Sequence, residues 1–412
     1  MKNKDKIVVI GGGAAGFFGA LTCANFNKNC EIIILEAGVK PLTKVKISGG
    51  GRCNVTHHCF EASELINYYP RGGKALRGAF TRFQPQDMIN WLNQRGVKLK
   101  TEEDGRIFPI NNDSQTIIDC FIKEAQLHRR NLRTKTLVKD IIKEENIFKI
   151  KLKTDDIIES NRLLIATGSN PSGYKFAQKL GHKIVSPVPS LFTFNIVDNR
   201  LKDLAGIAVE NATIKLLNTG KKKIQQTGAV LITHWGLSGP CVLKLSAWGA
   251  RILYENSYKL AIQINWLSNY NSENLKDYLL NLKIKNSRQK INKFSPFSTI
   301  PKRLWQSLVK FINIPENKVW TELSKKELNK LVLELTQGTY KIKGKGVFKE
   351  EFVTCGGVNL KEVNFQTMES KKCPGLYFAG EVLDIDGITG GFNFQSAWTT
   401  SFIAGKNMAQ NS

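Results

Sequence analysis

Three glycines near the N-terminus have the spacing of a phosphate-binding turn. Gly11, Gly13 and Gly16 follow the apolar run 6–10 in the pattern Gly-x-Gly-x-x-Gly. The first glycine permits a tight turn, the second lets a pyrophosphate approach the backbone, and the third lets the next helix pack closely. The N–H groups and the positive dipole end of that helix then face the anion.

An acidic residue completes this pattern. Glu36 follows Gly16 by 20 residues and ends the apolar run 31–35, where its carboxylate can accept a hydrogen bond from a ribose hydroxyl. Strand, glycine turn, helix, strand and acid therefore occur in the order of a dinucleotide-binding unit. We predict a dinucleotide site at this turn, and a glycine-rich turn in an ordinary α/β protein is the alternative.

A second group of reactive side chains lies between residues 44 and 56. Three consecutive glycines, Gly49 to Gly51, stand beside serine, arginine, cysteine and asparagine, and such a run can bring backbone N–H groups close to a ligand. Residues 37–60 contain four basic side chains and no acidic side chain. We predict a ligand-binding loop here, and a flexible loop without a ligand is the alternative.

A third group lies near the C-terminus. The run 376–380 has the pattern of a buried strand, Glu381 and Asp384 form an acidic turn, and the glycines at 387–391 precede a final helix. The N-terminus of such a helix can stabilise negative charge on a bound group.

The hydrophobic patterns predict the elements that must hold these groups. Residues 1–190 have an α/β pattern, 190–267 have strand-like segments between Gly, Asn and Ser clusters, and 271–337 have helical spacing. The strand pattern returns at about 339, and 374–412 close with a strand, a glycine turn and a helix. We predict helices at 84–96, 114–130, 273–284, 301–312 and 324–336, and strands at 133–142, 147–153, 157–166, 192–197, 206–217, 228–235 and 258–266.

This order of patterns predicts nested insertion. At 412 residues the chain is long enough for two or three domains. The expected fold class is α/β, a Rossmann-like dinucleotide-binding domain interrupted by a β-barrel-like domain that itself carries a helical insert. The predicted domains are 1–190 with 355–412, 191–268 with 338–354, and 269–337.

The cysteines and histidines indicate the cellular setting. The eight cysteines include no C-x-x-C pair, so we interpret them as reduced thiols of a cytoplasmic protein and expect neither a disulfide reductase nor a structural zinc site. His57 and His58 are adjacent, which is poor geometry for binding one ion, and we predict no metal.

The N-terminus also resembles an export signal. Lys2 and Lys4 precede an apolar stretch, and the run 21–24 resembles a lipoprotein cleavage site. The glycines at the fingerprint positions, with the strand and acid that follow, argue against export. No other stretch approaches the roughly 18 apolar residues of a membrane span, so we expect no membrane association.

The three motifs together resemble the glutathione-reductase-type FAD fold, and in detail the chain resembles the BaiN-like (YhiN-like) NAD(P)/FAD-dependent oxidoreductases. This resemblance covers essentially the whole chain. One departure is His57, since the family usually has Asn after Thr56. The matching stretches are GGGAAG at 11–16, KVKISGGGRCNVT at 44–56, ATG at 166–168, GLSGP at 236–240, TCGGV at 354–358 and FAGEVLDIDGITGGFNFQSAW at 378–398.

The resemblance implies an FAD site divided among the three groups. The turn 11–16 and Glu36 would hold the ADP half, the acids of the third group would reach the ribitol or pyrophosphate, and the 48–54 loop with the 390–394 turn would frame the isoalloxazine. The chain has no second glycine fingerprint, so NAD(P)H would dock transiently over the flavin. The predicted cofactor-binding residues are Gly11, Gly13, Ala14, Ala15, Gly16, Glu36, Ala37, Lys44, Ser48, Gly49, Gly50, Arg52, Cys53, Asn54, Val138, Ala166, Thr167, Gly168, Gly380, Glu381, Asp384, Gly390, Gly391, Phe392, Asn393 and Phe394.

The chemistry that the resemblance implies is reduction of a C=C bond conjugated to a carbonyl. A flavin can deliver a hydride from its N5, and the adjacent carbon then needs an acid. Cys53, beside Arg52, is the candidate catalytic residue, either as a thiol acid or as a thiolate whose pKa Arg52 lowers. The alternative is that Cys53 packs against the flavin. Within this family two substrate types have been proposed, steroid enones and a uridine of large-subunit ribosomal RNA that becomes dihydrouridine.

Positive charge favours the RNA substrate. The net charge is +25, and 271–345 carries 16 basic residues against 6 acidic ones. The basic stripe, residues 285–303, contains Phe294 and Phe297 and no acid, and such a pattern can hold phosphates and stack bases. Codon bias and a solvated helical face are the alternatives. The predicted RNA-binding residues are Lys285, Arg288, Lys290, Lys293, Lys302 and Arg303.

Three functions remain open from the sequence alone. The first is a flavin-dependent reductase of uridine in RNA, the second a reductase or oxidase of a small-molecule enone or amine, and the third an RNA-binding protein with structural FAD. The sequence carries no indication of the oligomeric state.

Overall fold

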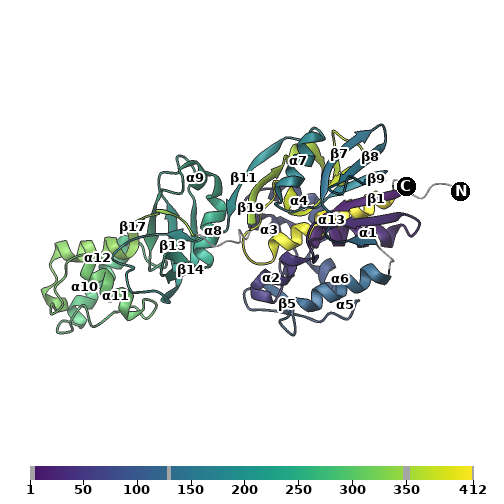
Figure 1. The fold of residues 1–412 in the computed structure, drawn as a ribbon. Helices are drawn as coiled ribbons and strands as arrows, with labels where there is room; N and C mark the ends of the chain where they lie inside the picture. Colours follow the sequence, from purple (N-terminus) through teal and green to yellow (C-terminus); the bar gives the residue numbers. More distant parts are fainter. Residues whose placement is uncertain (1–4, 128–130, 347–352, 411–412) are drawn as a thin grey trace. The chain divides into compact units, whose positions relative to one another are not determined.

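The computed structural model describes residues 5–127, 131–346 and 353–410, which divide into two compact units (Figure 1). The α/β unit consists of Met1–Pro187 and Val353–Ser412, and the insert unit, Val188–Phe352, interrupts it. The finer division into three domains, with 269–337 as a separate helical insert, stays a prediction.

A seven-stranded sheet forms the centre of the α/β unit. Five adjacent strands are parallel, and two short strands add antiparallel pairs at one edge. Ile7, Val8 and Val9 in the central strand are fully buried, as expected for a continuous apolar strand covered on both faces. In spatial order the strands are β20 (Val363–Asn364), β21 (Glu369–Ser370), β22 (Leu376–Phe378), β10 (Arg162–Ile165), β1 (Lys6–Ile10), β2 (Glu31–Leu35) and β6 (Asn131–Arg133).

Two helices, α1 (Ala14–Phe26) and α13 (Phe392–Gln410), pack side by side in this unit (Figure 1). A Cβ at Gly405 would lie 2.4 Å from the carbonyl oxygen of Gly19, so glycine permits this close contact. Phe18 on α1 meets Trp398 on α13 edge to face, with 5.7 Å between ring centres. The contact fixes the two helices whose N-termini carry the predicted glycine turns.

Smaller elements surround this core. The remaining helices of the α/β unit are α2 (Thr43–Gly51), α3 (Ala62–Leu65), α4 (Gly73–Phe80), α5 (Pro85–Asn93), α6 (Gln115–Leu127) and α7 (Pro171–Lys179), with the 3₁₀ turns η1 (Ile66–Tyr68), η3 (Leu360–Glu362) and η4 (Gly380–Val382). Its small sheets contain β3 (Thr56–His57), β5 (Arg106–Pro109) and β4 (Leu99–Thr101), then β7 (Val138–Glu144), β8 (Ile147–Leu152) and β9 (Ile157–Ser160), and finally β11 (Ile184–Ser190) with β19 (Val353–Val358).

The structure corrects several predicted elements. The predicted loop 37–60 contains α2, although Gly49 and Gly50 inside it have positive φ and interrupt the helix. The predicted strand 157–166 is two strands in different sheets, β9 and β10. The predicted helix 114–130 is described as α6, and its last three residues lie outside the described residues.

The insert unit contains a seven-stranded antiparallel sheet. In spatial order its strands are β17 (Gly338–Lys341), β16 (Ala261–Asn265), β13 (Ala208–Leu216), β14 (Gln225–Thr233), β15 (Gly236–Ser238), β12 (Phe194–Asn195) and β18 (Gly344–Lys345). Its helices are α8 (Pro240–Trp248), α9 (Ala250–Glu255), α10 (Ser272–Lys285), α11 (Lys302–Phe311) and α12 (Lys325–Gln337), with the 3₁₀ turn η2 (Trp320–Glu322).

One hydrophobic core joins the sheet and helices of the insert unit. Trp266 and Tyr340 from the sheet side and Trp305 and Trp320 from the helical side are all fully buried in it. The helical segment therefore shares its core with the β-sheet, because its apolar faces are covered by the same cluster.

Candidate functional site

The glycine turn after β1 is tight at two positions and open at the third. Gly11 has a φ of +110°, and a Cβ there would lie 2.4 Å from the Ala166 carbonyl oxygen. A Cβ at Gly16 would lie 1.8 Å from the Gly11 carbonyl oxygen. Around a Cβ at Gly13, the N-terminal cap of α1, no described heavy atom beyond the residue and its two chain neighbours lies within 4 Å. The backbone is therefore accessible at the position where a pyrophosphate is expected.

Glu36 lies at the end of β2 and is held by the turn itself. Its carboxylate accepts hydrogen bonds from the backbone N–H groups of Gly12, at 2.7 Å, and Gly38, at 2.6 Å. A carboxylate has about four acceptor positions, so these two bonds orient the side chain and leave capacity for a ligand hydroxyl. The turn and the acid that the sequence predicted thus lie together.

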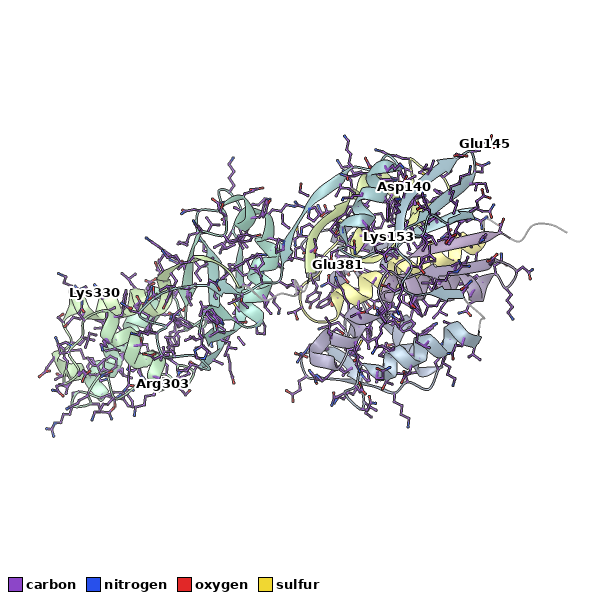
Figure 2. All side chains as sticks on the ribbon, in the orientation of Figure 1. Asp140, Glu145, Lys153, Arg303, Lys330 and Glu381 are labelled. Atoms are coloured by element: carbon purple, nitrogen blue, oxygen red, sulfur yellow. The ribbon has the colours of Figure 1, made fainter. Side chains whose placement is uncertain are left out.

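Three further predicted residues meet beside this turn. Glu381 is labelled in Figure 2. The ammonium of Lys44 lies 2.6 Å from its carboxylate, and a Cβ at Gly168 would lie 3.6 Å from the same carboxylate. Glu381 also accepts from the Thr354 backbone N–H at 3.1 Å. A Cβ at Gly380 would lie 2.8 Å from the Cβ of Ala15, so the turn η4 after β22 contacts the first turn of α1.

The loop after α2 and the turn before α13 are bonded to each other. In the amide orientation that satisfies both groups, Asn54 accepts from the Gly391 backbone N–H at 2.9 Å. The hydroxyl of Thr56 donates to Gln395 at 2.7 Å, and the indole of Trp398 donates to the Val55 carbonyl at 2.9 Å. These two hydrogen bonds join residues that are 339 and 343 positions apart in the sequence.

A buried ion pair supports the same turn and was missed by the sequence analysis. Both guanidinium arms of Arg71 bond to the carboxylate of Asp386, which is fully buried. The nearby Tyr69 hydroxyl donates to the Phe392 carbonyl at 2.6 Å. An acid inside the apolar 378–398 motif, such as Asp386, indicates that a basic side chain must pair with it once it is buried. The sequence does not indicate which basic residue that is.

The candidate catalytic pair is not arranged as an activated thiol. The guanidinium of Arg52 lies 2.6 Å from Glu102 and stacks 4.0 Å above the Phe108 ring, so its charge is engaged elsewhere. Cys53 is fully buried in an apolar cluster, and this burial raises the pKa of its thiol to about 12, against the opposing effect of a hydrogen bond with Ser48. The thiol therefore stays protonated, and the geometry favours the packing role over the thiolate.

Replacing this thiol tests the packing role. We expect a Cys53→Ala variant to keep its flavin and its turnover, because the side chain is covered by protein and its sulfur carries no charge. Steady-state reduction of the substrate measures the effect. A general acid contributes about 10²–10⁴-fold, so a loss of that size with unchanged flavin content would make Cys53 the proton donor.

The remaining predicted residues are spread over the α/β unit. Val138 begins β7, in the three-stranded sheet with β8 and β9, and two residues earlier the Thr136 backbone N–H donates to the Glu36 carbonyl at 2.9 Å. Thr167 has a buried hydroxyl without a hydrogen-bond partner among the described residues, beside Gly173 of α7. The Asn393 side chain bonds to both backbone groups of Gly387 and so closes the turn before α13.

The predicted RNA-binding cations lie in the insert unit. All six are exposed. Phe297, however, is only 6% exposed and packs against Tyr278 and Trp305, so it has no face to offer a base. The basic stripe is thus a charged surface. The prediction that Phe297 stacks on a base is wrong, because that ring belongs to the core.

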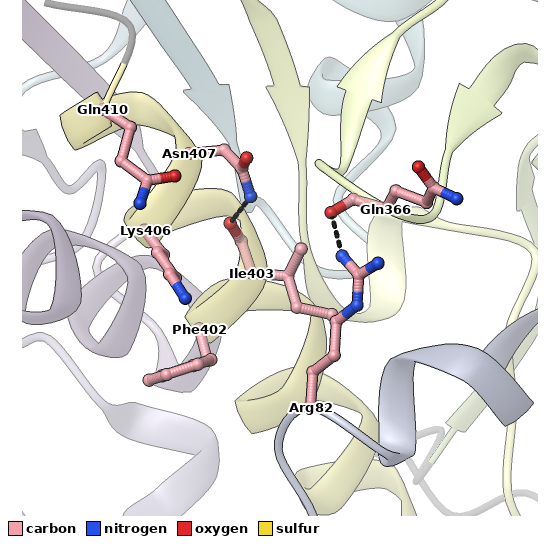
Figure 3. A pocket seen from close by; sticks show the side chains of 7 residues that line it. All are labelled: Arg82, Gln366, Phe402, Ile403, Lys406, Asn407 and Gln410. Atoms are coloured by element: carbon pink, nitrogen blue, oxygen red, sulfur yellow. Dashed lines mark hydrogen bonds between the residues drawn. The ribbon is translucent and has the colours of Figure 1, made fainter.

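A separate pocket lies along the C-terminal half of α13 (Figure 3). It has a volume of about 370 Å³, and the Arg82 guanidinium bonds to the Gln366 carbonyl at its edge. It contains none of the predicted cofactor residues, so it is distinct from the glycine-lined site. Its lining residues are Arg82, Gln366, Phe402, Ile403, Lys406, Asn407 and Gln410.

Comparison with protein families decides the class of this site. The sequence model of the HI0933-like protein Rossmann domain family matches residues 5–407. The chain belongs to this family. The predicted family and the Rossmann-like α/β fold are confirmed, and so is the predicted enzyme class, an FAD-dependent oxidoreductase.

Curated relatives of this family member span its full length. A protein of Escherichia coli (strain K12) named ribosomal RNA dihydrouridine synthase is 29% identical, with 97% of each chain covered. A protein of the same name in Haemophilus influenzae (strain ATCC 51907 / DSM 11121 / KW20 / Rd) is 27% identical, with 100% of each covered. The 3-dehydro-bile acid delta(4,6)-reductase of Clostridium scindens (strain ATCC 35704 / DSM 5676 / VPI 13733 / 19) is 26% identical, covering 98% of this chain and 99% of the relative.

Solved structures share the fold of this family member. A flavocytochrome c3 fumarate reductase in its open conformation gives a TM-score of 0.51 at 15% identity, covering 99% of this chain and 78% of the other. The 3-ketosteroid-delta4-(5alpha)-dehydrogenase of Rhodococcus jostii RHA1 gives 0.53 at 12% identity, covering 98% and 97%. Within the described residues, no helix has the length and apolarity needed to cross a membrane.

Proposed function

We propose that this chain reduces the C5=C6 bond of a uridine in ribosomal RNA to dihydrouridine, with FAD as cofactor and NAD(P)H as transient electron donor. The observation that carries the proposal is the open backbone at Gly13 between two tight glycines, in a chain whose full-length relatives include two ribosomal RNA dihydrouridine synthases. A cytoplasmic location belongs to the same proposal, since ribosomal RNA is found there.

The described residues fit the two ends of FAD. The open N-terminus of α1 would hold the pyrophosphate, and Glu36, oriented by Gly12 and Gly38, would accept from a ribose hydroxyl. The loop after α2 and the turn before α13, joined by the hydrogen bond between Asn54 and Gly391, would bind the isoalloxazine ring. The positive end of the α13 helix dipole lies next to this position. When bound, FAD would supply the hydride for the reduction.

The rigid support around the ring end would orient the cofactor. The ion pair of Arg71 with Asp386 and the hydrogen bond from Tyr69 both fix the chain just before α13. Such fixed supports reduce the reorganisation needed during reaction, which is how an enzyme site stabilises charge that develops in a transition state.

The charge of the insert unit supports RNA over a small apolar substrate. Residues 188–352 contain 26 Lys and Arg against 12 Asp and Glu, a net charge of +14 in that unit alone. Six of these cations are the exposed side chains of the basic stripe. A steroid-like substrate needs no such surface. The bile acid reductase among the relatives nevertheless favours a second candidate function, reduction of a small-molecule enone.

Charge reversal in the basic stripe tests the RNA proposal. A variant with Lys285, Arg288, Lys290 and Lys293 changed to Glu should bind ribosomal RNA more weakly, because phosphate contacts are lost. The slope of log affinity against log salt concentration should become shallower by about one unit for each lost contact. Fluorescence anisotropy with a labelled ribosomal RNA fragment at several salt concentrations measures both quantities.

A matched control carries the same charge change elsewhere in the insert unit. Lys310, Lys325, Lys326 and Lys330 are exposed, and Figure 2 shows Lys330 and Arg303 on opposite edges of the helical part. Their change to Glu should reduce binding less, and both variants should keep their flavin. Equal binding and an equal salt slope in the wild type and the stripe variant would exclude the stripe. No salt-dependent RNA binding by the wild type would favour the enone substrate.

A further inference from the structure

The tip of one β-hairpin in the insert unit exposes a tryptophan. Strands β14 and β15 are joined by His234 and Trp235 alone, since Thr233 pairs with Gly236. The Trp235 side chain is 68% exposed, whereas Trp266, Trp305 and Trp320 in the same unit are fully buried. This side chain therefore contributes little to the core of its own unit.

The residue types of this turn are unusual for its length. Two-residue hairpin turns favour Asn and Gly because their central residues usually have positive φ. Neither His234 nor Trp235 has positive φ. A turn that only reverses the chain needs no large aromatic side chain, and departures from local sequence rules concentrate at functional sites. The exposed ring is thus a candidate for contact with another molecule.

A second exposed apolar residue lies beside the turn. The backbone N–H of Ile196 donates to the Trp235 carbonyl at 2.9 Å, and the next residue, Val197, is 83% exposed. A Cβ at Gly236 would lie 2.3 Å from the Phe194 carbonyl oxygen, so glycine is required for this approach. Trp235 and Val197, here called the Trp235 platform, are the exposed apolar residues of two chain segments that this backbone pairing joins.

The charges around the platform favour an anionic partner. Strand β18 pairs with the other edge of β12, and the Lys343 backbone N–H donates to the Asn195 carbonyl at 2.8 Å. Lys343 is exposed there. The acid next to Val197, Asp198, is neutralised by Arg200, which donates to its two oxygens at 2.8 and 2.6 Å. An exposed aromatic ring and an exposed cation on neighbouring segments of one sheet are a combination that can bind single-stranded nucleic acid.

We propose that Trp235 stacks on an unpaired base of single-stranded RNA, with Val197 extending the apolar contact and Lys343 meeting the backbone phosphate. This inference rests on the RNA substrate proposed above. It adds a contact that does not depend on charge, from a ring more exposed than those of the basic stripe, where Phe297 is buried and Phe294 is half-buried. A substrate uridine must leave its stack to react, so a stacking surface would bind the RNA in the required unpaired form.

Anisotropy with a fluorescein-labelled 12-nucleotide oligouridylate tests this contact. We expect Trp235→Ala to weaken binding by about 5- to 150-fold, the range for loss of one stacked base. The salt slope should stay that of the wild type, because no phosphate contact is lost. Trp235→Phe should restore much of the affinity, and Trp235→Leu should not, because leucine is apolar but has no aromatic face.

Two controls separate stacking from general damage. Trp248→Ala removes another partly exposed tryptophan of the insert unit, 39% exposed, and should bind like the wild type. A 12-base-pair RNA duplex should bind Trp235→Ala and wild type equally, because its bases are already stacked. Unchanged oligouridylate binding by Trp235→Ala, or full affinity of Trp235→Leu, overturns the inference while leaving the RNA substrate intact. If the wild type binds a ribosomal RNA fragment but not oligouridylate, the stacking inference fails alone; if it binds neither the fragment nor oligouridylate, the proposed function itself fails.

Discussion

A Gly13→Val variant is expected to fold normally and to purify without FAD. Apart from the two chain neighbours, no described protein atom lies within 4 Å of a Cβ at position 13, so the polypeptide itself tolerates the larger side chain. The same space is where the pyrophosphate would approach the N-terminus of α1. The branched side chain would fill it. The protein should be colourless, and the wild type should be yellow and release FAD rather than FMN on denaturation.

Two other glycines serve as controls for this variant. Gly78, on α4, also has no described heavy atom within 4 Å of a Cβ and lies outside the predicted site, so Gly78→Val should keep its flavin. Gly16→Ala would place a Cβ 1.8 Å from the Gly11 carbonyl and should destabilise the turn itself. Circular dichroism reports folding in each case. A folded Gly13→Val protein with a full complement of FAD would contradict the placement of the pyrophosphate.

Local patterns in the sequence were sufficient to predict the glycine turn and the acid that lies against it. The glycine turn, the strand before it and Glu36 lie within about thirty residues, and their geometry follows from backbone sterics and short-range hydrogen bonds. The long apolar strands β1 and β2 are recognisable for the same reason, because burial on both faces selects continuous Val and Ile.

The features of the site that the sequence did not predict depend on contacts between distant segments. Asp386 and its partner Arg71 are 315 residues apart, and no local pattern pairs them. The burial of Cys53 and Phe297 also arises from tertiary packing, against Trp398 in one cluster and Trp305 in another. Both side chains have polar and basic neighbours in the sequence, which suggested exposure. Sequence spacing therefore located the reactive residue types and did not decide which of them face a ligand.

A further prediction concerns the reaction product, dihydrouridine in ribosomal RNA. If the chain reduces a uridine of ribosomal RNA, cells that lack it should lose a dihydrouridine from large-subunit ribosomal RNA completely, since spontaneous reduction of an aromatic uracil ring is negligible. Dihydrouridine in transfer RNA should be unaffected, which controls for general changes in RNA modification. Restoring the wild-type chain should restore the modification, and restoring Gly13→Val should not, because that variant lacks the proposed cofactor.

Mass spectrometry of ribosomal RNA from cells with and without this protein is the most direct measurement. We expect one uridine that is heavier by two hydrogens only when the wild-type chain is present. Identical dihydrouridine content in the two ribosomal RNA samples would contradict the RNA substrate.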